Sequence, residues 1–285
     1  MKPNSAFLSL PKNFWASVRL ISQEVEYTEK STGQIKIPVV DEIHSKLEKL
    51  EVDFSRLQLQ RVTNLSFGQM LQDYFAFRAD VINTYVKPRL MNVAEAKKIF
   101  KSFYKDLQPS CPIPMNKQKG KMKQPAFLTG LVNMLVEANA NGSPCDYDPH
   151  QLTVVTKEDL PVRTLARRVD GAFPSSVNPI AVWEIKEYYY TTTFGSRVAD
   201  GIYETLLDGL ELEELREHEG IDIKHYLIVD AYDTWWKLGK SYLCRIIDML
   251  HMGYIDEALF GREIIERLPN LVDEWVKIHQ SQSSQ

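Results

Sequence analysis

The chain has 285 residues, of which 44% are hydrophobic, and its net charge is −4. This length allows one large domain or two modest ones with a substantial core. The apolar stretches are far shorter than the roughly 20 residues that span a bilayer, and the first residues lack a signal-peptide pattern. We therefore expect a cytoplasmic protein without a membrane partner. Three cysteines without CxxC spacing exclude a disulfide framework and a zinc ribbon.

The first part of the chain has the periodicity of helices. Between residues 40 and 107, apolar residues recur at helical spacing, as in Ile43, Leu47 and Leu50. Asn92 is a predicted N-cap, with Glu95 at the third helical position. The prolines of "PSCPIP" then interrupt the pattern. We predict a helical N-terminal region over residues 1–110 and a second domain over 111–285.

The second domain begins with a lysine-rich loop and continues as a mixture of helices and strands. A helix is predicted in "QPAFLTGLVNMLVEANANG". The elements predicted after it are strands at 151–156, 164–173 and 180–190, a helix at 196–219, a strand at 225–232, and two or three helices to the end. Short turns between the first three strands favour an antiparallel meander, and the later helix allows a parallel partner strand. The predicted fold class is α/β, a mixed sheet flanked by helices.

Three charged residues interrupt the apolar strand segments. Side chains two residues apart share one face of a strand, so Glu184 and Lys186 point the same way, while Trp183 points to the opposite face. Asp170 ends the preceding strand segment, from which it can reach Glu184. Leaving a charge unpaired in a core costs several kcal/mol, so we expect these three charged groups to have a partner or a function.

A divalent cation supplies one explanation. The carboxylates of Asp170 and Glu184 and the carbonyl oxygen of Ile185 are hard ligands of the kind that Mg²⁺ prefers. Such an ion orients a water molecule and neutralises charge on a phosphate, and Lys186 would lie beside that water. This chemistry fits a phosphodiester substrate. The alternative is a structural salt bridge between Glu184 and Lys186 at a sheet edge.

The arrangement resembles a known family of nucleases. Asp170, thirteen further residues and then Glu184-Ile185-Lys186 are similar to the PD-(D/E)xK signature, best known from type II restriction endonucleases. The resemblance covers roughly residues 125–232, and Val169 stands where the family often has proline. It implies a restriction-endonuclease-like core in which Asp170, Glu184 and Lys186 bind Mg²⁺ and activate water, with Mn²⁺ as a substitute ion. It also implies that Glu137, on the preceding helix, assists.

The spacing of the motif is not specific by itself. Thirteen intervening residues also separate Asp208 from Asp222-Ile223-Lys224. Asp208 falls in a predicted helix, however, and Asp222 precedes its strand, whereas Glu184 lies inside one. The order of helix and strands therefore carries the prediction.

Several basic residues are candidates for binding the DNA backbone. The lysine loop contributes Lys117, Lys119, Lys121 and Lys123. The segment before Asp170 contributes Arg163, Arg167 and Arg168, and the start of the 196–219 helix contributes Ser196, as its cap, and Arg197. The alternatives are a solvated loop for the lysines, pairing with the acidic last third of the chain for the arginines, and a structural turn at Ser196.

Taken with the resemblance, these features predict a Mg²⁺-dependent endonuclease that cuts double-stranded DNA at a specific sequence. The resemblance also implies a homodimer, as suits a two-fold palindromic site, and a cognate DNA methyltransferase in the same cell. The N-terminal region would serve DNA recognition or dimerisation. The alternatives are a repair, recombination or phage nuclease with the same core, or a non-catalytic DNA-binding or assembly protein on the same fold.

Overall fold

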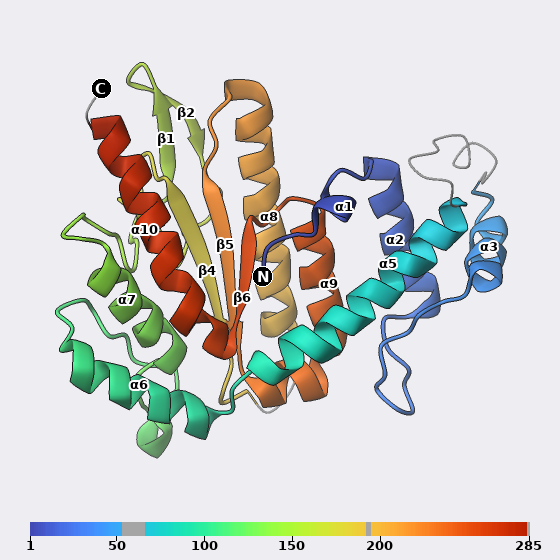
Figure 1. Ribbon diagram of the computed structural model, residues 1–285, viewed down its shortest axis with the longest axis horizontal. Coiled ribbons are helices and arrows are strands. Elements are labelled where there is room, and N and C mark those ends of the chain that lie inside the picture. The colour runs from blue at the N-terminus through green and yellow to red at the C-terminus, as the bar shows by residue number, and fades with distance from the viewer. Residues whose placement is uncertain (53–65, 192–194, 284–285) are drawn as a thin grey trace.

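The computed structural model describes residues 1–52, 66–191 and 195–283, without the side chains of Lys121, Arg197 and Ser283 (Figure 1). A four-stranded sheet lies at its centre, in the order β3-β4-β5-β6. These strands are β3 (Gly171–Phe173), β4 (Ala181–Glu187), β5 (Lys224–Asp230) and β6 (Glu257–Phe260). β3 is an antiparallel edge strand, and the other three strands are parallel. The mixed sheet that the sequence predicts is therefore present.

Helices cover both faces of this sheet. α7 (Phe127–Asn139) and α10 (Ile264–Ser283) lie on one face, and α8 (Ser196–Glu219) and α9 (Lys240–His251) lie on the other (Figure 1). On the first face, Trp183 stacks on Trp275 of α10 with 5.6 Å between ring centroids. On the second face, Val182 packs with Leu212 of α8. β4 therefore contributes alternate residues to two separate layers, as strand geometry requires.

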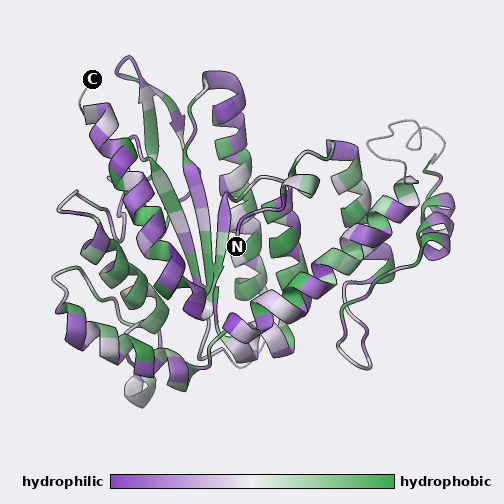
Figure 2. Cartoon of the chain, in the orientation of Figure 1, coloured by the Kyte–Doolittle hydropathy of each residue, from purple (hydrophilic) through white to green (hydrophobic). Residues whose placement is uncertain are grey.

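The helices differ in polarity according to their surroundings. α7 is hydrophobic over most of its length, whereas α8 and α10 alternate hydrophobic and hydrophilic residues (Figure 2). This agrees with the burial of α7, in which every residue from Leu131 to Val136 is buried. Among the described residues, no helix combines the length and the apolar character that crossing a bilayer requires.

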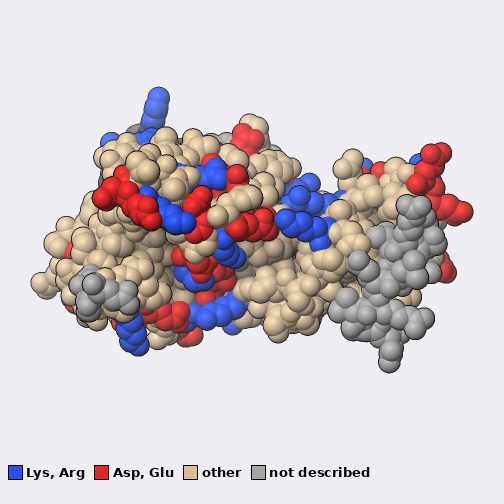
Figure 3. Space-filling model, turned by 90° about the horizontal axis from the view of Figure 1, so that it is seen from above, with Lys and Arg blue, Asp and Glu red and all other residues tan. Residues whose placement is uncertain are grey.

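The N-terminal helices form a separate small core. They are α1 (Ser5–Leu8), α2 (Lys12–Val25), α3 (Val40–Lys49) and α5 (Phe67–Val81), and they pack around Phe14 and Phe75. α5 runs from this group to the sheet (Figure 1) and continues as a π-helical turn (Ile82–Val86) and a 3₁₀ turn (Lys87–Arg89). Seen from above, basic side chains gather where the N-terminal helices join the larger part (Figure 3).

α6 (Val93–Leu107) packs with the sheet region. Its Phe100 ring lies 5.6 Å from that of Phe127 at the start of α7. The predicted capping box at its start is confirmed, because Asn92 accepts from the Glu95 N–H and Glu95 accepts from the Asn92 N–H. Although the predicted N-terminal region extends to residue 110, this helix thus shares its core with α7.

Some predicted elements are confirmed and others are wrong. The predicted helix at 196–219 has the bounds of α8. The predicted three-strand meander is wrong in its first part, because β1 (Val154–Lys157) and β2 (Leu160–Thr164) form a hairpin sheet of their own. The antiparallel pairing predicted for its second and third strands is present between β3 and β4. β6 was expected to be helical, but it is a strand whose four residues are all buried. A short strand buried on both faces has no alternation by which to recognise it. The predicted helical segment at 53–65 lies outside the described residues.

Candidate functional site

Glu184 and Lys186 lie side by side on the α8 face of β4. Glu184 has no exposed surface and Lys186 is 5% exposed. The Lys186 Nζ donates to the Glu184 Oε2 across 2.7 Å. On one side β4 pairs with β5 along its whole length, whereas β3 on the other side pairs with it only as far as Trp183. The pair is nevertheless buried, because α8 covers this face of β4.

Asp170 joins this pair because β3 is short. The last strand pair between β3 and β4 is Gly171 with Trp183. Beyond it, the Asp170 N–H donates to the Trp183 carbonyl across 3.1 Å. Its side chain then continues the ladder, since Asp170 Oδ2 accepts from the Ile185 N–H at 2.7 Å. The N–H and C=O of one strand residue point to the same edge. The Ile185 carbonyl therefore faces the edge where the Asp170 carboxylate lies.

Two glycines permit the close approaches at this site. A Cβ on Gly171 would lie 2.1 Å from the Trp183 indole, so the residue after Asp170 must be glycine for this packing. A Cβ on Gly201 in α8 would lie 3.3 Å from the Lys186 side chain and 2.8 Å from the Tyr188 hydroxyl. Gly171 therefore allows β3, and Gly201 allows α8, to lie close to β4.

Three further residues complete a cluster that we call the carboxylate site, consisting of Arg167, Asp170, Glu184, Lys186, Glu204 and Asp208. Arg167 Nη1 lies 2.9 Å from Glu184 Oε1 and 2.6 Å from Asp208 Oδ2. Glu204, one turn before Asp208 on α8, lies 3.4 Å from the Lys186 Nζ. Arg167 was a candidate for contact with DNA or for pairing with the acidic last third of the chain, and its contact with Asp208 inside the site matches the second alternative. The sequence contains a signal that could have identified Asp208. It lies at helical spacing from Leu212 and Leu215, which are buried, so its side chain is expected on the same buried face of the helix.

The buried charges shift each other's pKa. Burial and the nearby Glu184 raise the pKa of Asp170 to about 6, against the opposing effect of Lys186. Burial and Glu184 also raise the pKa of Asp208 to about 7. Burial acts to raise the pKa of Glu184, but Lys186 and Arg167 outweigh it, so this pKa falls below its usual value. Glu184 is thus the firmly ionised centre of the site.

The site contains more carboxyl groups than cations and leaves polar atoms unsatisfied. Asp208 Oδ1 is buried without a hydrogen-bond partner. Glu184 Oε1 lies at ion-pair distance from Arg167 but makes no hydrogen bond. Buried polar atoms are nearly always bonded, and an exception calls for a function or for a bound water or ion. The surplus of carboxyl groups favours a cation as the missing partner.

Asp170, Glu184 and the Ile185 carbonyl match the hard oxygen ligands that Mg²⁺ takes. The described residues contain no group of three or more His, Cys, Asp or Glu side chains arranged to hold a metal. Mg²⁺ keeps several waters and uses only one or two carboxylates together with substrate phosphate, so two carboxylates and one carbonyl fit its needs. A zinc site, which takes three or four protein ligands, does not fit.

The structure does not bring Glu137 to this site. Glu137 lies on α7, which covers the opposite face of the sheet, and its carboxylate accepts from the Ser110 N–H at 3.1 Å. A different acid links α7 to β4. Glu187 accepts from the N–H groups of Phe127 and Thr129 at 2.9 and 3.0 Å, which caps the helix. Burial raises the pKa of Glu187 to about 7. The sequence predicted neither this cap nor the position of Glu137.

The other predicted DNA contacts are dispersed. Arg163 forms an ion pair with Glu214 across 2.6 Å, which matches the alternative of pairing with the acidic part of the chain, and Arg168 is exposed. Ser196 was expected to cap α8, but Gly195 occupies that position and Ser196 is the first helical residue. The side chain of Arg197 lies outside the described residues.

The lysine loop lies at the same end of the sheet as Lys186. Lys117, Lys119 and Lys123 are exposed, and the side chain of Lys121 lies outside the described residues. The loop is closed by bonds between Asn116 and Gln124 and leads directly into α7. Because Glu187 caps α7, the loop and the end of β4 are neighbours.

Comparison with known proteins divides the chain into two matched parts. One model, described as a domain of unknown function (DUF7690), matches residues 1–85, and a second, also a domain of unknown function (DUF7687), matches residues 91–275. The two matches adjoin just before α6, where the sheet region begins. Neither a curated protein nor a solved structure matches the chain. Since the second model covers more than half of the chain, including the whole carboxylate site, the chain belongs to the DUF7687 family.

Proposed function

We propose that this chain is a Mg²⁺-dependent endonuclease of the PD-(D/E)xK type with a restriction-endonuclease-like core. It hydrolyses phosphodiester bonds of double-stranded DNA at a specific sequence, as a cytoplasmic homodimer alongside a cognate DNA methyltransferase. One observation carries the proposal. The Asp170 carboxylate, just before β3, accepts a hydrogen bond from the N–H of Ile185, the middle residue of Glu184-Ile185-Lys186 on β4, and so lies next to the buried Glu184–Lys186 pair.

The contacts support a task for each of these residues. Glu184 and Asp170 are the ligands that would hold Mg²⁺, which supplies a polarised water and charge neutralisation at phosphate. Lys186 orients the Glu184 carboxylate through its 2.7 Å hydrogen bond and places an ammonium group beside the ligands. Burial acts to lower the pKa of Lys186, but Glu184 and Asp170 outweigh this effect and raise it. The ammonium therefore stays charged, as stabilisation of a phosphoryl transition state requires.

The surroundings support a DNA substrate of this site. The lysine loop offers exposed ammonium groups at the end of the sheet where β4 finishes. Lysines contact phosphates without reading sequence, so this loop supplies affinity and register. The base contacts that give specificity would come from other surfaces.

The proposal is tested by incubating the protein with plasmid and phage DNA, with Mg²⁺ or with chelator, and mapping the ends. We expect discrete fragments that require Mg²⁺. Asp170→Ala, Glu184→Ala and Lys186→Ala should each abolish cleavage. We also expect Mg²⁺ to raise the melting temperature of the wild type, and to raise that of Glu184→Ala less. This measurement does not depend on which DNA sequence is supplied.

The chain contains a matched control for this experiment. Asp222 and Lys224 have the same spacing as Glu184 and Lys186 and form an ion pair, but both are over a third exposed. Asp222→Ala should cut like the wild type. Normal cleavage by all three site variants, or equal loss in the Asp222 control, would contradict the assignment. A smear of fragments would indicate a nonspecific nuclease with the same site.

A second candidate is a non-catalytic DNA-binding or assembly protein on the same fold. The observation that favours it is the pairing of each Glu184 oxygen with a cation, Lys186 on one side and Arg167 on the other. In that case the cluster is structural. Mg²⁺ would then leave the melting temperature unchanged, and no DNA would be cut.

A further inference from the structure

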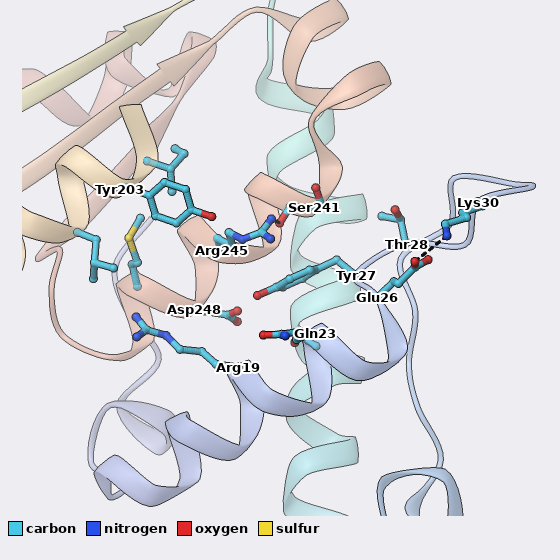
Figure 4. A pocket seen from close by; sticks show the side chains of 14 residues that line it. Arg19, Gln23, Glu26, Tyr27, Thr28, Lys30, Tyr203, Ser241, Arg245 and Asp248 are labelled. Carbon is cyan, nitrogen blue, oxygen red and sulfur yellow. Dashed lines mark hydrogen bonds and ion pairs between the residues drawn. The ribbon is translucent and has the colours of Figure 1, made fainter. Parts of the chain in front are cut away.

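A pocket lies at the junction of the N-terminal helices and the sheet region, apart from the carboxylate site (Figure 4). Its volume is about 600 Å³, within the range of small-molecule sites. Its walls come from α2, the segment that follows α2, α8 and α9. Sites between two structural regions commonly bind ligands, because both regions contribute side chains.

The pocket has an excess of positive charge. Among its acidic residues, Glu26 pairs with Lys30 across 2.8 Å, and Asp248 pairs with the buried Arg78 across 3.0 Å. Arg19 and Arg245 also line it. Within the described chain, neither of these two arginines forms an ion pair with a carboxylate. Arg19 donates instead to the Met252 Sδ across 3.6 Å, and among the described residues the Arg245 guanidinium has no carboxylate at ion-pair distance.

Arg245 is held in a fixed orientation. Its guanidinium lies 4.3 Å from the centre of the Tyr27 ring and 4.4 Å from that of Tyr242. One of its N–H groups donates to the Ser241 carbonyl at 3.2 Å. A planar guanidinium fixed in this way is suited to a phosphate or carboxylate, which it can bind with two parallel hydrogen bonds.

The rest of the pocket is apolar and aromatic. Ile202, Leu206 and Met249 line it. Tyr203, which is 51% exposed, and Tyr27 lie on opposite sides of Arg245 (Figure 4). An occupant that uses both the charge and these walls has an anionic group joined to a flat apolar body.

We propose that this pocket binds a free mononucleotide, with its phosphate at Arg245 and Arg19 and its base against Tyr203 and the apolar wall. The volume accommodates one nucleotide, and aromatic side chains bind the faces of bases. This site does not depend on the proposed nuclease activity. α8 separates the two sites, with Ile202 and Leu206 at the pocket and Glu204 and Asp208 at the carboxylate site.

The test is isothermal titration calorimetry of the full chain with adenosine and thymidine 5′-monophosphates, with adenosine and inorganic phosphate as partial probes. We expect a mononucleotide to bind more tightly than either partial probe. Arg245→Gln should weaken binding about tenfold or more, because a charged hydrogen-bonding pair is lost. Arg19→Gln should also weaken it. Arg19 is exposed, so this variant keeps the test valid if Arg245→Gln destabilises the fold.

The matched control is Lys12→Gln, which removes a positive charge from the same helix outside the pocket and should leave binding unchanged. No binding of either mononucleotide at millimolar concentration would overturn the proposal. So would equal binding by the Arg19 variant, or binding only of a single-stranded oligonucleotide.

Discussion

Two of the buried clusters of charged residues in the described part of the chain differ in their balance of positive and negative charge. In the first, Arg78 of α5 meets Asp248 of α9, both almost fully buried. The two Asp248 oxygens accept from Arg78, and one also accepts from the Tyr74 hydroxyl at 2.6 Å. In the second, the carboxylate site, four carboxyl groups share two cations. Each cluster also has a buried atom without a hydrogen-bond partner, Arg78 Nε in the first and Asp208 Oδ1 in the second.

This difference in charge balance indicates a structural role for the Arg78–Asp248 pair and a functional role for the carboxylate site. A balanced buried pair stays neutral and joins two elements, here a helix of the N-terminal region to one that covers the sheet. An unbalanced cluster carries excess negative charge and raised carboxyl pKa values, which are costs for a merely structural contact. Perturbed carboxyl groups of this kind are typical of functional sites.

The largest effect is expected from breaking the balanced pair. Asp248→Ala leaves Arg78 buried without its anion and should lower the free energy of unfolding by about 3–5 kcal/mol. Chemical denaturation measures this loss. In the double variant Arg78→Met with Asp248→Leu, no charge remains buried, so a large part of the stability should return. A loss below about 1 kcal/mol in Asp248→Ala would show that the pair does not hold the two regions together.

An intermediate effect is expected from Asp208 and depends on pH. Its pKa is raised to about 7 in the folded chain, whereas an unfolded aspartate titrates near about 3.9. The folded state therefore binds the proton more tightly, and the stability that this provides is lost as pH rises from about 4 to about 7. A pKa shift of this size corresponds to a fall in stability of about 4 kcal/mol over that window. Asn cannot titrate, so Asp208→Asn should remove a measurable part of this fall.

The comparison for Asp208 is the free energy of unfolding of wild type and variant at both ends of the window. Asp222→Asn, in an exposed ion pair, is the control and should parallel the wild type. If the free energy of unfolding changed with pH in the same way in Asp208→Asn and in the wild type, the raised pKa of Asp208 would be contradicted.

The smallest effect is expected from an exposed ion pair, which provides the baseline for both clusters. Lys12 lies 3.8 Å from Glu217 of α8, and its side chain is 79% exposed. Lys12→Gln should change the free energy of unfolding by less than about 1 kcal/mol. A greater loss would mean that this ion pair contributes more to stability than an exposed pair normally does.

The sequence predicted local structure well wherever short-range rules apply. The bounds of α8 and the capping box at Asn92 follow from residues within a turn of each other. β6 was missed because a short, fully buried strand lacks a periodic signal. The resemblance to the nuclease family implied that Glu137 assists at the site, but sequence order does not say which face of a sheet the helix that carries it covers.

What the sequence determined by itself is that Glu184 and Lys186 share a face of one strand, because the two-residue period of a strand leaves no other choice. Only the tertiary structure decided what surrounds them. Arg167 and Asp208 are 41 residues apart in the chain, and their 2.6 Å contact depends on how α8 rotates against the sheet. That rotation is set by the packing of many side chains at once, so no local pattern encodes it.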